Sequence, residues 1–431
     1  MGGSYLSSPV TKKISHDTSN ELLVVGVCSM QGWRETQEDS HNCELDFDTN
    51  TALFAVYDGH GGSEVAEYCS AYLPQCIKDA NHYRNGNVVD ALTHAFLRVD
   101  KSLISPDVLR AMKREMEEGE LDSLRVEAAM PLDQVLDKYR GIKDVIGNVN
   151  VHRDTSFASQ FGDLSIQKRK QQDMMNTTFL HADEEETDDE YDSGAGSSSS
   201  SEESENDEEK ENESERDEAK LIGFRSGCTA VVAVIRDGEL FVANAGDSRC
   251  VVCQCGTAID MSREHKPEDD VERKRIENAG GKVSAEGRVN NGLNVSRAIG
   301  DHSYKRDEKL DASEQLIIAV PDVRSLKIDS CREEFMVIAC DGVWNCMSSQ
   351  SVVDFVRKRI ADRGKVSTIC EELLDACLSP SKSGNGTGCD NMTCIVVKFK
   401  RSVVKAGKRS REEVQVENED RKRVRIAGIC D

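Results

Sequence analysis

The chain has 431 residues, of which 38% are hydrophobic, and its formal net charge is −24 at pH 7. No apolar run approaches the roughly 20 residues that a transmembrane helix needs, so we expect no membrane span. The first residues lack the basic flank and apolar stretch of a signal peptide, and the 16 cysteines are scattered through strand-like segments. We therefore expect reduced, buried cysteines in a nuclear or cytosolic protein and no disulfide scaffold.

The negative charge is concentrated in one segment. Residues 183–218 hold 19 Asp and Glu against Lys210 and Arg216 and so carry −17, which leaves only −7 for the rest of the chain. Such a segment repels itself and cannot bury apolar area, so we expect it to be disordered within an insertion that spans 106–221. Two interpretations stay open, a solubilising linker or a docking surface for basic proteins such as histones.

Before the insertion, the chain predicts the first part of a folded domain over residues 21–105. The preceding residues, 1–20, are polar, and we expect them to form a flexible N-terminus. Apolar runs predict strands at 22–28 and 52–56. Apolar residues at helical spacing predict a helix over 88–103.

After the insertion, order returns over residues 222–400 as short strands linked by hairpin turns, with helices set apart. The predicted strands are 228–235, 240–245, 250–253, 316–320, 323–328, 335–339 and 394–399, and the predicted helices are 350–362 and 367–378. This pattern favours an α+β fold class in which antiparallel sheets are faced by helices.

The last segment, 401–431, is a basic tail. Its two clusters, Lys408-Arg409 and Arg421-Lys422-Arg423-Val424-Arg425, are separated by 11 residues, which is the spacing of a bipartite nuclear import signal. Basic runs also arise as solvated tails. We expect the protein to act in the nucleus, with the cytoplasm as a second compartment.

Three aspartates stand at the ends of apolar strands. Asp58 lies in the glycine-dense turn Tyr57-Asp58-Gly59-His60-Gly61-Gly62, Asp341 follows the run 335–340, and Asp390 comes shortly before 394–397. Each could be an ordinary turn residue. Three carboxylates without a Cys/His cluster of zinc spacing instead favour a site for magnesium or manganese.

The segment after the first strand supplies more groups for such a site. Arg34 offers a planar guanidinium suited to phosphate oxygens, and Glu38 and Asp39 add further acidity. So many carboxylates in one pocket would repel one another unless cations were present, and two divalent ions could neutralise them and activate a water molecule. With His60 close by, the set of residues fits hydrolysis of a phosphate ester.

The chain resembles the metal-dependent serine/threonine protein phosphatases of type 2C. The matching motifs occur in family order over about 21–105 and 222–400, and they are Gly32-Trp33-Arg34 with Gln37-Glu38-Asp39, Tyr57 to Gly62, Ser226-Gly227-Cys228-Thr229-Ala230, Ala243 to Arg249, His265-Lys266-Pro267, Ala279-Gly280-Gly281, Val295 to Asp301, Cys340-Asp341-Gly342-Val343-Trp344 and Asp390-Asn391-Met392-Thr393. The resemblance implies a β-sandwich of two antiparallel sheets flanked by helices, a four-layer αββα arrangement.

The resemblance also implies a role for each matching residue. It implies two ions, Mg²⁺ or Mn²⁺, with Asp58 bridging them, the Gly59 carbonyl binding one of them, and Asp341 with Asp390 binding the other. Glu38 and Asp39 would act directly or through water. Arg34 would hold the substrate phosphate, and His60 would be the general acid. Water activated by the ions would attack the phosphate directly, so no phosphoenzyme is implied. Residues 265–300 would form a flap beside the site.

One position departs from the family pattern. Some members carry an aspartate directly after the Trp of the Asp-Gly-x-Trp motif, where it helps to hold a weak third metal, and this chain has Asn345 there. Asp247 matches the other position of that third site. A neutral amide is a poorer ligand for a hard dication, so the third metal is in doubt.

Three functions are compatible with parts of this sequence. A phosphoprotein phosphatase needs Asp58, Asp341, Asp390 and Arg34, and all four are present. An acidic escort protein for histones or other basic proteins, with secondary or absent catalysis, is the alternative. A metal-dependent nuclease would need a basic surface, which the acidic segment argues against. We expect a monomer that acts on phosphorylated proteins, above all basic nuclear proteins, and that makes no direct contact with nucleic acid.

Overall fold

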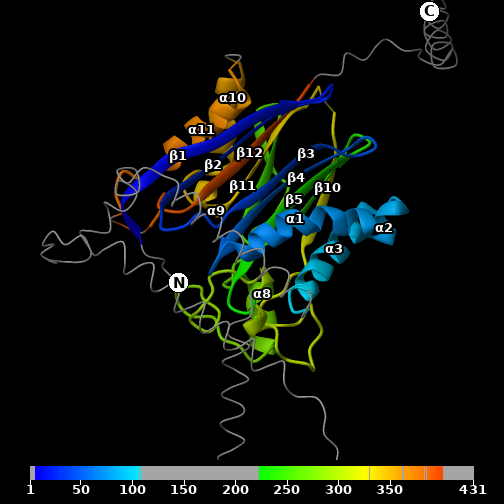
Figure 1. Cartoon of the computed structure of the whole chain (residues 1–431), viewed down its shortest axis with the longest axis vertical. Helices are drawn as coiled ribbons and strands as arrows, with labels where there is room; N and C mark the ends of the chain where they lie inside the picture. The colour runs from blue at the N-terminus through cyan, green and yellow to red at the C-terminus, as the bar shows by residue number, and fades with distance from the viewer. Residues whose placement is uncertain are drawn as a thin grey trace, which may run out of the picture. The chain divides into compact units, whose positions relative to one another are not determined.

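Two six-stranded antiparallel sheets lie at the centre of the protein (Figure 1). The structure is a computed structural model and describes residues 5–105, 108 and 223–400, apart from 330, 362, 363, 383 and 385. The first sheet contains, in spatial order, β1 (Tyr5–Ser19), β2 (Leu23–Arg34), β12 (Met392–Phe399), β11 (Glu333–Ala339), β7 (Arg249–Gln254) and β8 (Thr257–Asp260). The second sheet contains β10 (Asp322–Lys327), β6 (Glu239–Ala245), β5 (Gly227–Arg236), β4 (Thr51–His60) and β3 (Ser40–Asp48), and β9 (Ile299–Gly300) also pairs with β5.

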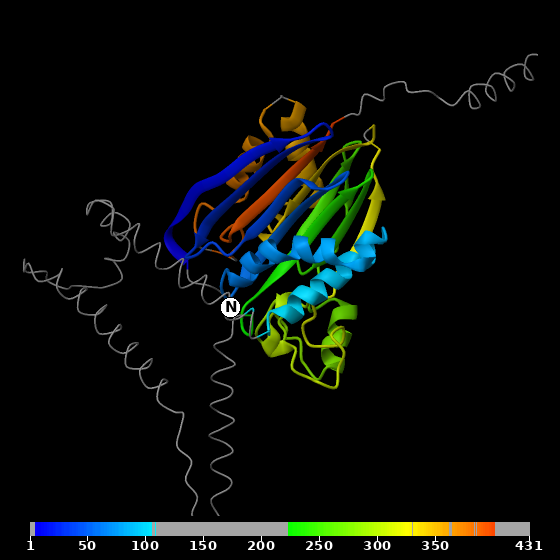
Figure 2. The same cartoon turned by 45° about the vertical axis from the view of Figure 1, so that its right-hand side comes forward.

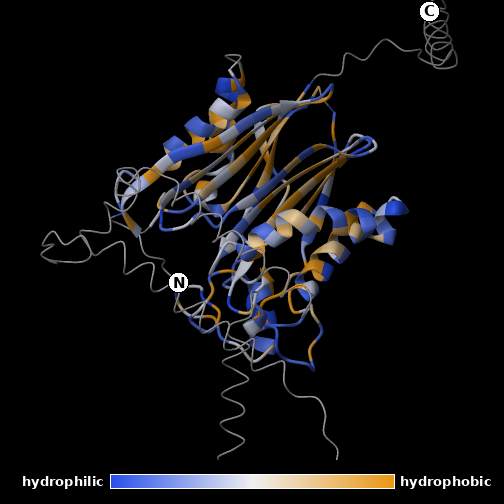
Figure 3. Ribbon diagram, viewed as in Figure 1, coloured by the Kyte–Doolittle hydropathy of each residue, from blue (hydrophilic) through white to orange (hydrophobic). Residues whose placement is uncertain are grey.

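The central strands are apolar on both faces because each face is covered. In β4, Phe54 and Val56 pack between the two sheets, whereas Leu53, Ala55 and Tyr57 face the helices on the other side. Alternation of side chains along a strand produces this division, and it explains why these segments read as continuous apolar runs (Figure 3). The sheets therefore enclose one core between them and build a further core on each outer face.

The helices form the two outer layers (Figure 2). Helices α1 (Glu64–Asp79) and α3 (Val88–Ser102) pack on the outer face of the β4 sheet, with the short α2 (Asn81–Arg84) between them. Helices α10 (Ser349–Ala361) and α11 (Val366–Cys377) cover the outer face of the β2 sheet. This is the α+β, four-layer αββα arrangement that the sequence and the resemblance predicted, and the fold class is confirmed.

The prediction of a flexible N-terminus over 1–20 was wrong for residues 5–19, which form the edge strand β1. The strand is held by backbone pairing with β2 and by polar contacts with α11. The Asp17 carboxylate accepts hydrogen bonds from the backbone amide and hydroxyl of Ser367, at 2.9 and 2.5 Å, and Lys13 pairs with Asp375 at 2.6 Å. Neither kind of contact leaves an apolar period in the sequence, which is why the segment looked unstructured.

Other differences lie outside the central strands. Residues 316–320 were predicted as a strand but contribute only an isolated bridge between Ile318 and Arg297. The chain before β10 also contains helix α8 (Asp270–Asn278), which was not predicted, and the 3-10 turn η2 (His302–Tyr304). Most of the predicted insertion 106–221, including the acidic segment 183–218, and the whole basic tail 401–431 lie outside the described residues. Within the part of the chain that the structure describes, no helix is long and apolar enough to cross a membrane.

Candidate active site

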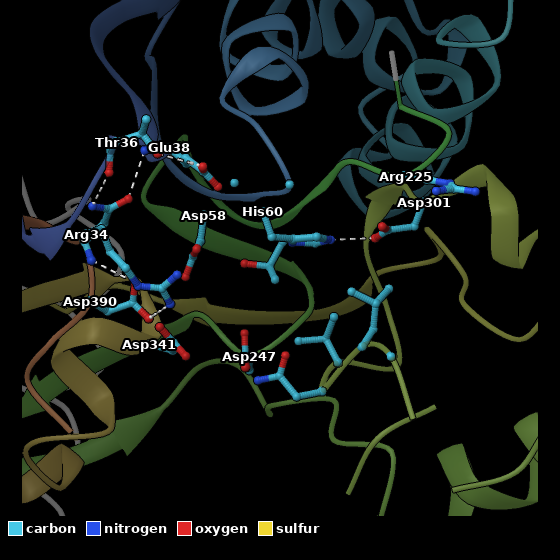
Figure 4. A pocket seen from close by; sticks show the side chains of 18 of the residues that line it. Arg34, Thr36, Glu38, Asp58, His60, Arg225, Asp247, Asp301, Asp341 and Asp390 are labelled. Atoms are coloured by element: carbon cyan, nitrogen blue, oxygen red, sulfur yellow. Dashed lines mark hydrogen bonds and ion pairs between the residues drawn. The ribbon is translucent and has the colours of Figure 1, made fainter. Parts of the chain in front are cut away.

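A cavity of about 450 Å³ opens at one end of the sandwich, where strand ends of both sheets meet (Figure 4). Asp58 stands near the end of β4, Asp341 begins helix α9 (Asp341–Trp344) directly after β11, and Asp390 lies two residues before β12. Asp247 lies in the turn between β6 and β7. Residues far apart in the sequence thus reach one cavity, whose wall includes the predicted site residues Arg34, Glu38, Asp58, Gly59, His60, Asp247, Asp341 and Asp390.

Asp58 and Asp341, at the centre of the cavity, have no ion-pair partner among the described residues. Asp58, Asp247 and Asp341 each place an oxygen within 4.8 Å of the others. Burial, together with the negative charges of Asp39, Asp341 and Asp390, raises the pKa of Asp58 well above its ordinary value. The pKa of Asp341 is raised well above normal by burial and by Asp247 and Asp390. The structure therefore concentrates acidic groups that only added positive charge could ionise together at neutral pH.

Asp39 lies behind the cluster and is not on the cavity wall. Its Oδ2 accepts hydrogen bonds from the Thr393 hydroxyl at 2.7 Å and from the Cys340 thiol at 3.3 Å. Its Oδ1 is buried and has no hydrogen-bond partner among the described residues. Burial raises the pKa of Asp39 to about 7, although the bond from Thr393 opposes the shift. A buried carboxylate oxygen of this kind is suited to a cation, directly or through water.

Arg34 and the two acids near it are fixed by the loop before β12. The guanidinium of Arg34 donates to Asp390 at 2.7 Å, and Arg34 Nε has no partner among the described residues. The side chain of Asn391 accepts a hydrogen bond from the Glu38 backbone amide at 2.9 Å and donates to the carbonyl oxygens of Gln31 and Thr36 at 2.8 and 2.9 Å. Asn391 therefore ties the segment that carries Arg34 and Glu38 to the segment that carries Asp390.

His60 has a buried carboxylate partner, as Figure 4 shows. Its Nε2 lies 2.7 Å from Oδ2 of Asp301, whose side chain is only 1% exposed. Burial by itself would lower the pKa of His60, but the charge and hydrogen bond of Asp301 outweigh burial and raise it. The pair needs a glycine at position 227, because a Cβ there would lie 2.4 Å from Oδ2 of Asp301 and 2.8 Å from Nε2 of His60.

The position of the doubtful third metal is partly occupied by side-chain donors. Lys266 donates to Oδ2 of Asp247 at 2.5 Å, and Asn345 donates to Oδ2 of Asp341 at 3.0 Å. The positive charge of Lys266 also lowers the pKa of Asp341, but burial and the neighbouring carboxylates outweigh it. Asp247 thus differs from Asp58, because the protein supplies it with a cation.

The comparisons with known proteins decide the family. The family model described as "Protein phosphatase 2C" matches residues 23–123 and 109–386. The chain belongs to the protein phosphatase 2C family. It is 41% identical to Protein phosphatase 1G of Rattus norvegicus, over 95% of this chain and 96% of that protein, and 38% identical to Probable protein phosphatase 2C 21 of Arabidopsis thaliana, over 93% of both.

Solved structures agree with this fold. A phosphatase from a pathogenic strain of Toxoplasma gondii superposes with a TM-score of 0.55 at 18% identity, covering 90% of this chain and 96% of that one. A serine-threonine phosphatase 2C from Toxoplasma gondii gives 0.52 at 15% identity, over 90% of this chain and 99% of the other. The chain is accordingly a phosphoprotein phosphatase of a metal-dependent family.

Two residues of phosphatase 2C motifs without an assigned role, His265 and Arg297, belong to an ionic network beside the cavity. Glu272 of α8 accepts hydrogen bonds from Arg275 at 2.7 Å and from Arg297 at 2.6 Å, and Arg297 also donates to Asp322 at 2.8 Å. The ring of His265 lies 3.2 Å from Asp322. The network holds the segment 265–300, and residues 292–295 of that segment line the cavity. The expected flap thus lies beside the site.

Several site residues were not assigned a role from the sequence. Asp301, Lys266 and Asn391 lie in motifs that carried the resemblance, but their contacts depend on partners more than a dozen residues away. Arg225 lines the cavity on the side of His60 and lay just outside the motif that begins at Ser226. For Asp301 and Lys266, the available signal was a charged residue, within a motif, to which no catalytic role had been assigned.

Proposed function

We propose that the chain hydrolyses phosphoserine and phosphothreonine by direct attack of water on phosphorus, without a phosphoenzyme. The observation that carries this proposal is one cavity lined by a cluster of carboxylates in which the pKa of Asp58 is strongly raised, together with a guanidinium and a histidine with a raised pKa. None of the described residues that line the cavity is a cysteine, and a nucleophilic side chain is not required when water is the attacking group.

We propose two resident ions, Mg²⁺ or Mn²⁺. Asp58 would contact both, the Gly59 carbonyl one of them, and Asp341 with Asp390 the other, while Glu38 and Asp39 would act directly or through water. When bound, the ions supply positive charge that ionises the carboxylates and lowers the pKa of a water molecule. The donor set fits, because hard dications prefer oxygen ligands and the pKa of Asp58 is raised by repulsion that a cation would remove.

The protein's own groups bind phosphate and move the leaving-group proton. Arg34 would hold two phosphate oxygens through its guanidinium, which is already oriented by Asp390. His60 would donate a proton from its ring to the serine or threonine alkoxide as the ester bond breaks. Asp301 supports that role because it favours the protonated imidazole and fixes the ring.

We propose that the acidic segment 183–218 recruits basic substrates and that the enzyme acts as a monomer in the nucleus. The support is the local charge of the segment and the import-like spacing of the basic tail. The alternative function, an acidic escort for histones or other basic proteins, is not exclusive, since the same segment would serve both. Escort activity alone would leave the ordered cavity without a role.

Hydrolysis of a phosphothreonine peptide with magnesium or manganese tests the enzyme. Asp58→Asn and Asp341→Asn should abolish turnover, and unchanged turnover in either variant would contradict the metal assignment. Deleting residues 183–218 should spare the small peptide and slow the dephosphorylation of a basic phosphoprotein. An equal loss on both substrates would show that the segment supports folding and not recruitment.

A further inference from the structure

Two cysteines meet beside the elements that carry Asp341 and Asp390. Cys346 follows helix α9, and Cys377 is the last residue of helix α11. The sulfur of Cys346 lies 3.4 Å from the carbonyl oxygen of Cys377 and 3.3 Å from that of Gly342. The side chain of each cysteine is also the largest cause of the pKa shift of the other, as expected for neighbouring side chains.

This pair differs from the other cysteine pairs of the described chain in its access to solvent. Cys69 and Cys228 are both 0% exposed, with sulfur atoms 3.5 Å apart, and Cys370 and Cys394 are also both 0% exposed. Cys346 is only partly buried, whereas Cys377 is 5% exposed. Part of Cys346 is therefore open to solvent, whereas its neighbour Cys377 is buried.

The reactivity of the two kinds of pair differs in the same direction. The hydrogen bond from Cys377, followed by that from the Gly388 amide, lowers the pKa of Cys346 despite burial. Burial raises the pKa of Cys228 well above its ordinary value, and the bond to Cys370 and burial do the same for Cys394. The same contact raises the pKa of Cys377, so within this pair Cys346 is the cysteine that more readily forms the nucleophilic thiolate.

The pair is tightly packed against both metal-carrying segments. Cys346 lies five residues after Asp341, on the turn that α9 begins. The carbonyl oxygen of Cys377 leaves no room above Gly388, where a Cβ would approach it to 2.4 Å, and Gly388 precedes Asp390 by two residues. Gly342 is packed equally closely on the other side, since a Cβ there would lie 2.1 Å from the Asn391 carbonyl oxygen. A shift of either cysteine must therefore move the loops that position the carboxylates.

We propose that Cys346 and Cys377 are a reversible modification site at which hydroperoxides switch the phosphatase off through an intramolecular disulfide. The loss of activity rests on the proposed roles of Asp341 and Asp390, whereas formation of the disulfide does not. A disulfide draws two sulfur atoms to about 2.05 Å, which is well inside their contact distance and pulls the turn after α9 toward the end of α11. The displaced turn and the loop 388–390 then no longer hold the two carboxylates in register.

The chemistry balances with hydrogen peroxide as the oxidant. The Cys346 thiolate attacks one peroxide oxygen, the O–O bond breaks, and the leaving hydroxide takes a proton to form water, which leaves a sulfenic acid on Cys346. The Cys377 sulfur then attacks the Cys346 sulfur, the S–O bond breaks, and the hydroxide leaves as water with the Cys377 proton. Two thiols are oxidised to one disulfide while one peroxide is reduced to two waters. A dithiol reverses the change by thiol–disulfide exchange.

The test treats the full-length enzyme with hydrogen peroxide in magnesium buffer, blocks free thiols, and maps disulfides by mass spectrometry after non-reducing digestion. We expect a peptide that links Cys346 to Cys377, free thiols at Cys69 and Cys228, and a fall of about tenfold or more in phosphopeptide hydrolysis that dithiothreitol restores. Cys346→Ser should keep its activity under peroxide. Cys331→Ser, which removes an exposed cysteine away from this pair, should lose activity as the wild type does.

Two results would overturn the proposal. One is unlinked Cys346 and Cys377 in enzyme that peroxide has inactivated, including a link from Cys346 to the neighbouring Cys389 in their place. The other is a complete Cys346–Cys377 link with unchanged turnover. If Cys346→Ser folds poorly, Cys377→Ser is used in its place. Peroxide should inactivate Cys377→Ser, and dithiothreitol should restore less of its activity than it restores in the wild type. Disulfide mapping does not require an active enzyme. If the proposed function fails and the protein shows no turnover before oxidation, the mapping still tests whether the disulfide forms, so the two failures are distinguishable.

Discussion

The two acidic centres of this molecule are built in opposite ways. In the flap, Glu272 is buried but meets the guanidinium groups of Arg275 and Arg297, and these outweigh burial and lower its pKa to about 2. In the cavity, Asp58 meets further carboxylates, and its pKa is raised well above normal. The same residue chemistry therefore gives a permanently ionised structural centre in one place and a strained, proton-binding centre in the other.

The two centres differ in the source of the positive charge, which comes from the protein in the flap and from a ligand in the cavity. An acid cluster that only supports the fold is neutralised by the chain's own arginines. An acid cluster that remains unneutralised after folding lacks a counter-charge, and exogenous cations complete it. Asp247 lies between the two cases, because it belongs to the cavity trio but is paired with Lys266.

The largest effect is expected from a change at Asp58. Asp58→Asn removes a proposed ligand of both ions, so turnover should fall by roughly a thousandfold or more, since metal ions supply several kcal/mol of transition-state stabilisation. The same change removes a repelling carboxylate, so the metal-free variant should unfold at an equal or higher denaturant concentration than the metal-free wild type. Steady-state kinetics and urea unfolding in the presence of a chelator measure the two effects. A variant that is both inactive and clearly less stable without metal would refute this account.

The flap should respond in the opposite sense. Glu272→Gln leaves two arginines without their buried counter-charge and should lower the free energy of unfolding by about 3 kcal/mol, the lower end for breaking a buried ion pair because glutamine keeps one acceptor. The change should be the same with and without magnesium, which urea titrations in both buffers measure. Glu286→Gln, at an exposed position of the same segment, is the matched control and should change stability by less than about 0.5 kcal/mol.

The contribution of Glu272 to the stability of the protein should depend on pH. The pKa of Glu272 is depressed to about 2 in the folded protein, against about 4.5 for the unfolded chain. Its contribution is therefore fully present above pH 4.5 and is lost as the pH falls from there toward 2. Urea midpoints measured at decreasing pH should converge for the wild type and Glu272→Gln. A stability gap that stayed constant down to the lowest pH would mean that the ion pairs contribute little.

A smaller effect is expected at Asp301, the carboxylate that faces His60. Asp301→Asn keeps a side chain of the same shape but removes the charge that favours the protonated ring, so kcat for a phosphothreonine peptide should fall by about 10- to 100-fold, less than the full value of a general acid. An aryl phosphate has a leaving group that needs no proton, so its turnover should fall much less. Equal losses on both substrates would show that Asp301 only maintains the fold of the loop.

Features that depend on the local sequence could be predicted, whereas contacts between distant residues could not. The central strands and the strand-end aspartates Asp58, Asp341 and Asp390 were visible because continuous apolar runs and glycine turns are local features. The neutralising partners were not, because the bond between Glu272 and Arg297 joins a helix residue to a residue 25 positions later that no periodic pattern relates to it. The strand β1 was missed for a similar reason, since its polar anchor Asp17 contacts Ser367 from 350 residues away.

The smallest effect is expected from strand β1, which places Tyr5 beside Arg34. The two residues are register partners, and the guanidinium carbon of Arg34 lies 6.0 Å from the Tyr5 ring centroid. Such a cation–π contact is worth about 0.5–1 kcal/mol at an exposed site, so Tyr5→Ala should raise KM for a phosphopeptide about two- to fivefold with little change in kcat. Tyr5→Phe keeps the ring and should restore the wild-type KM. If phenylalanine failed to do so, or if kcat fell instead, the ring would not be what orients the arginine, and β1 would serve only to cover the edge of the sheet.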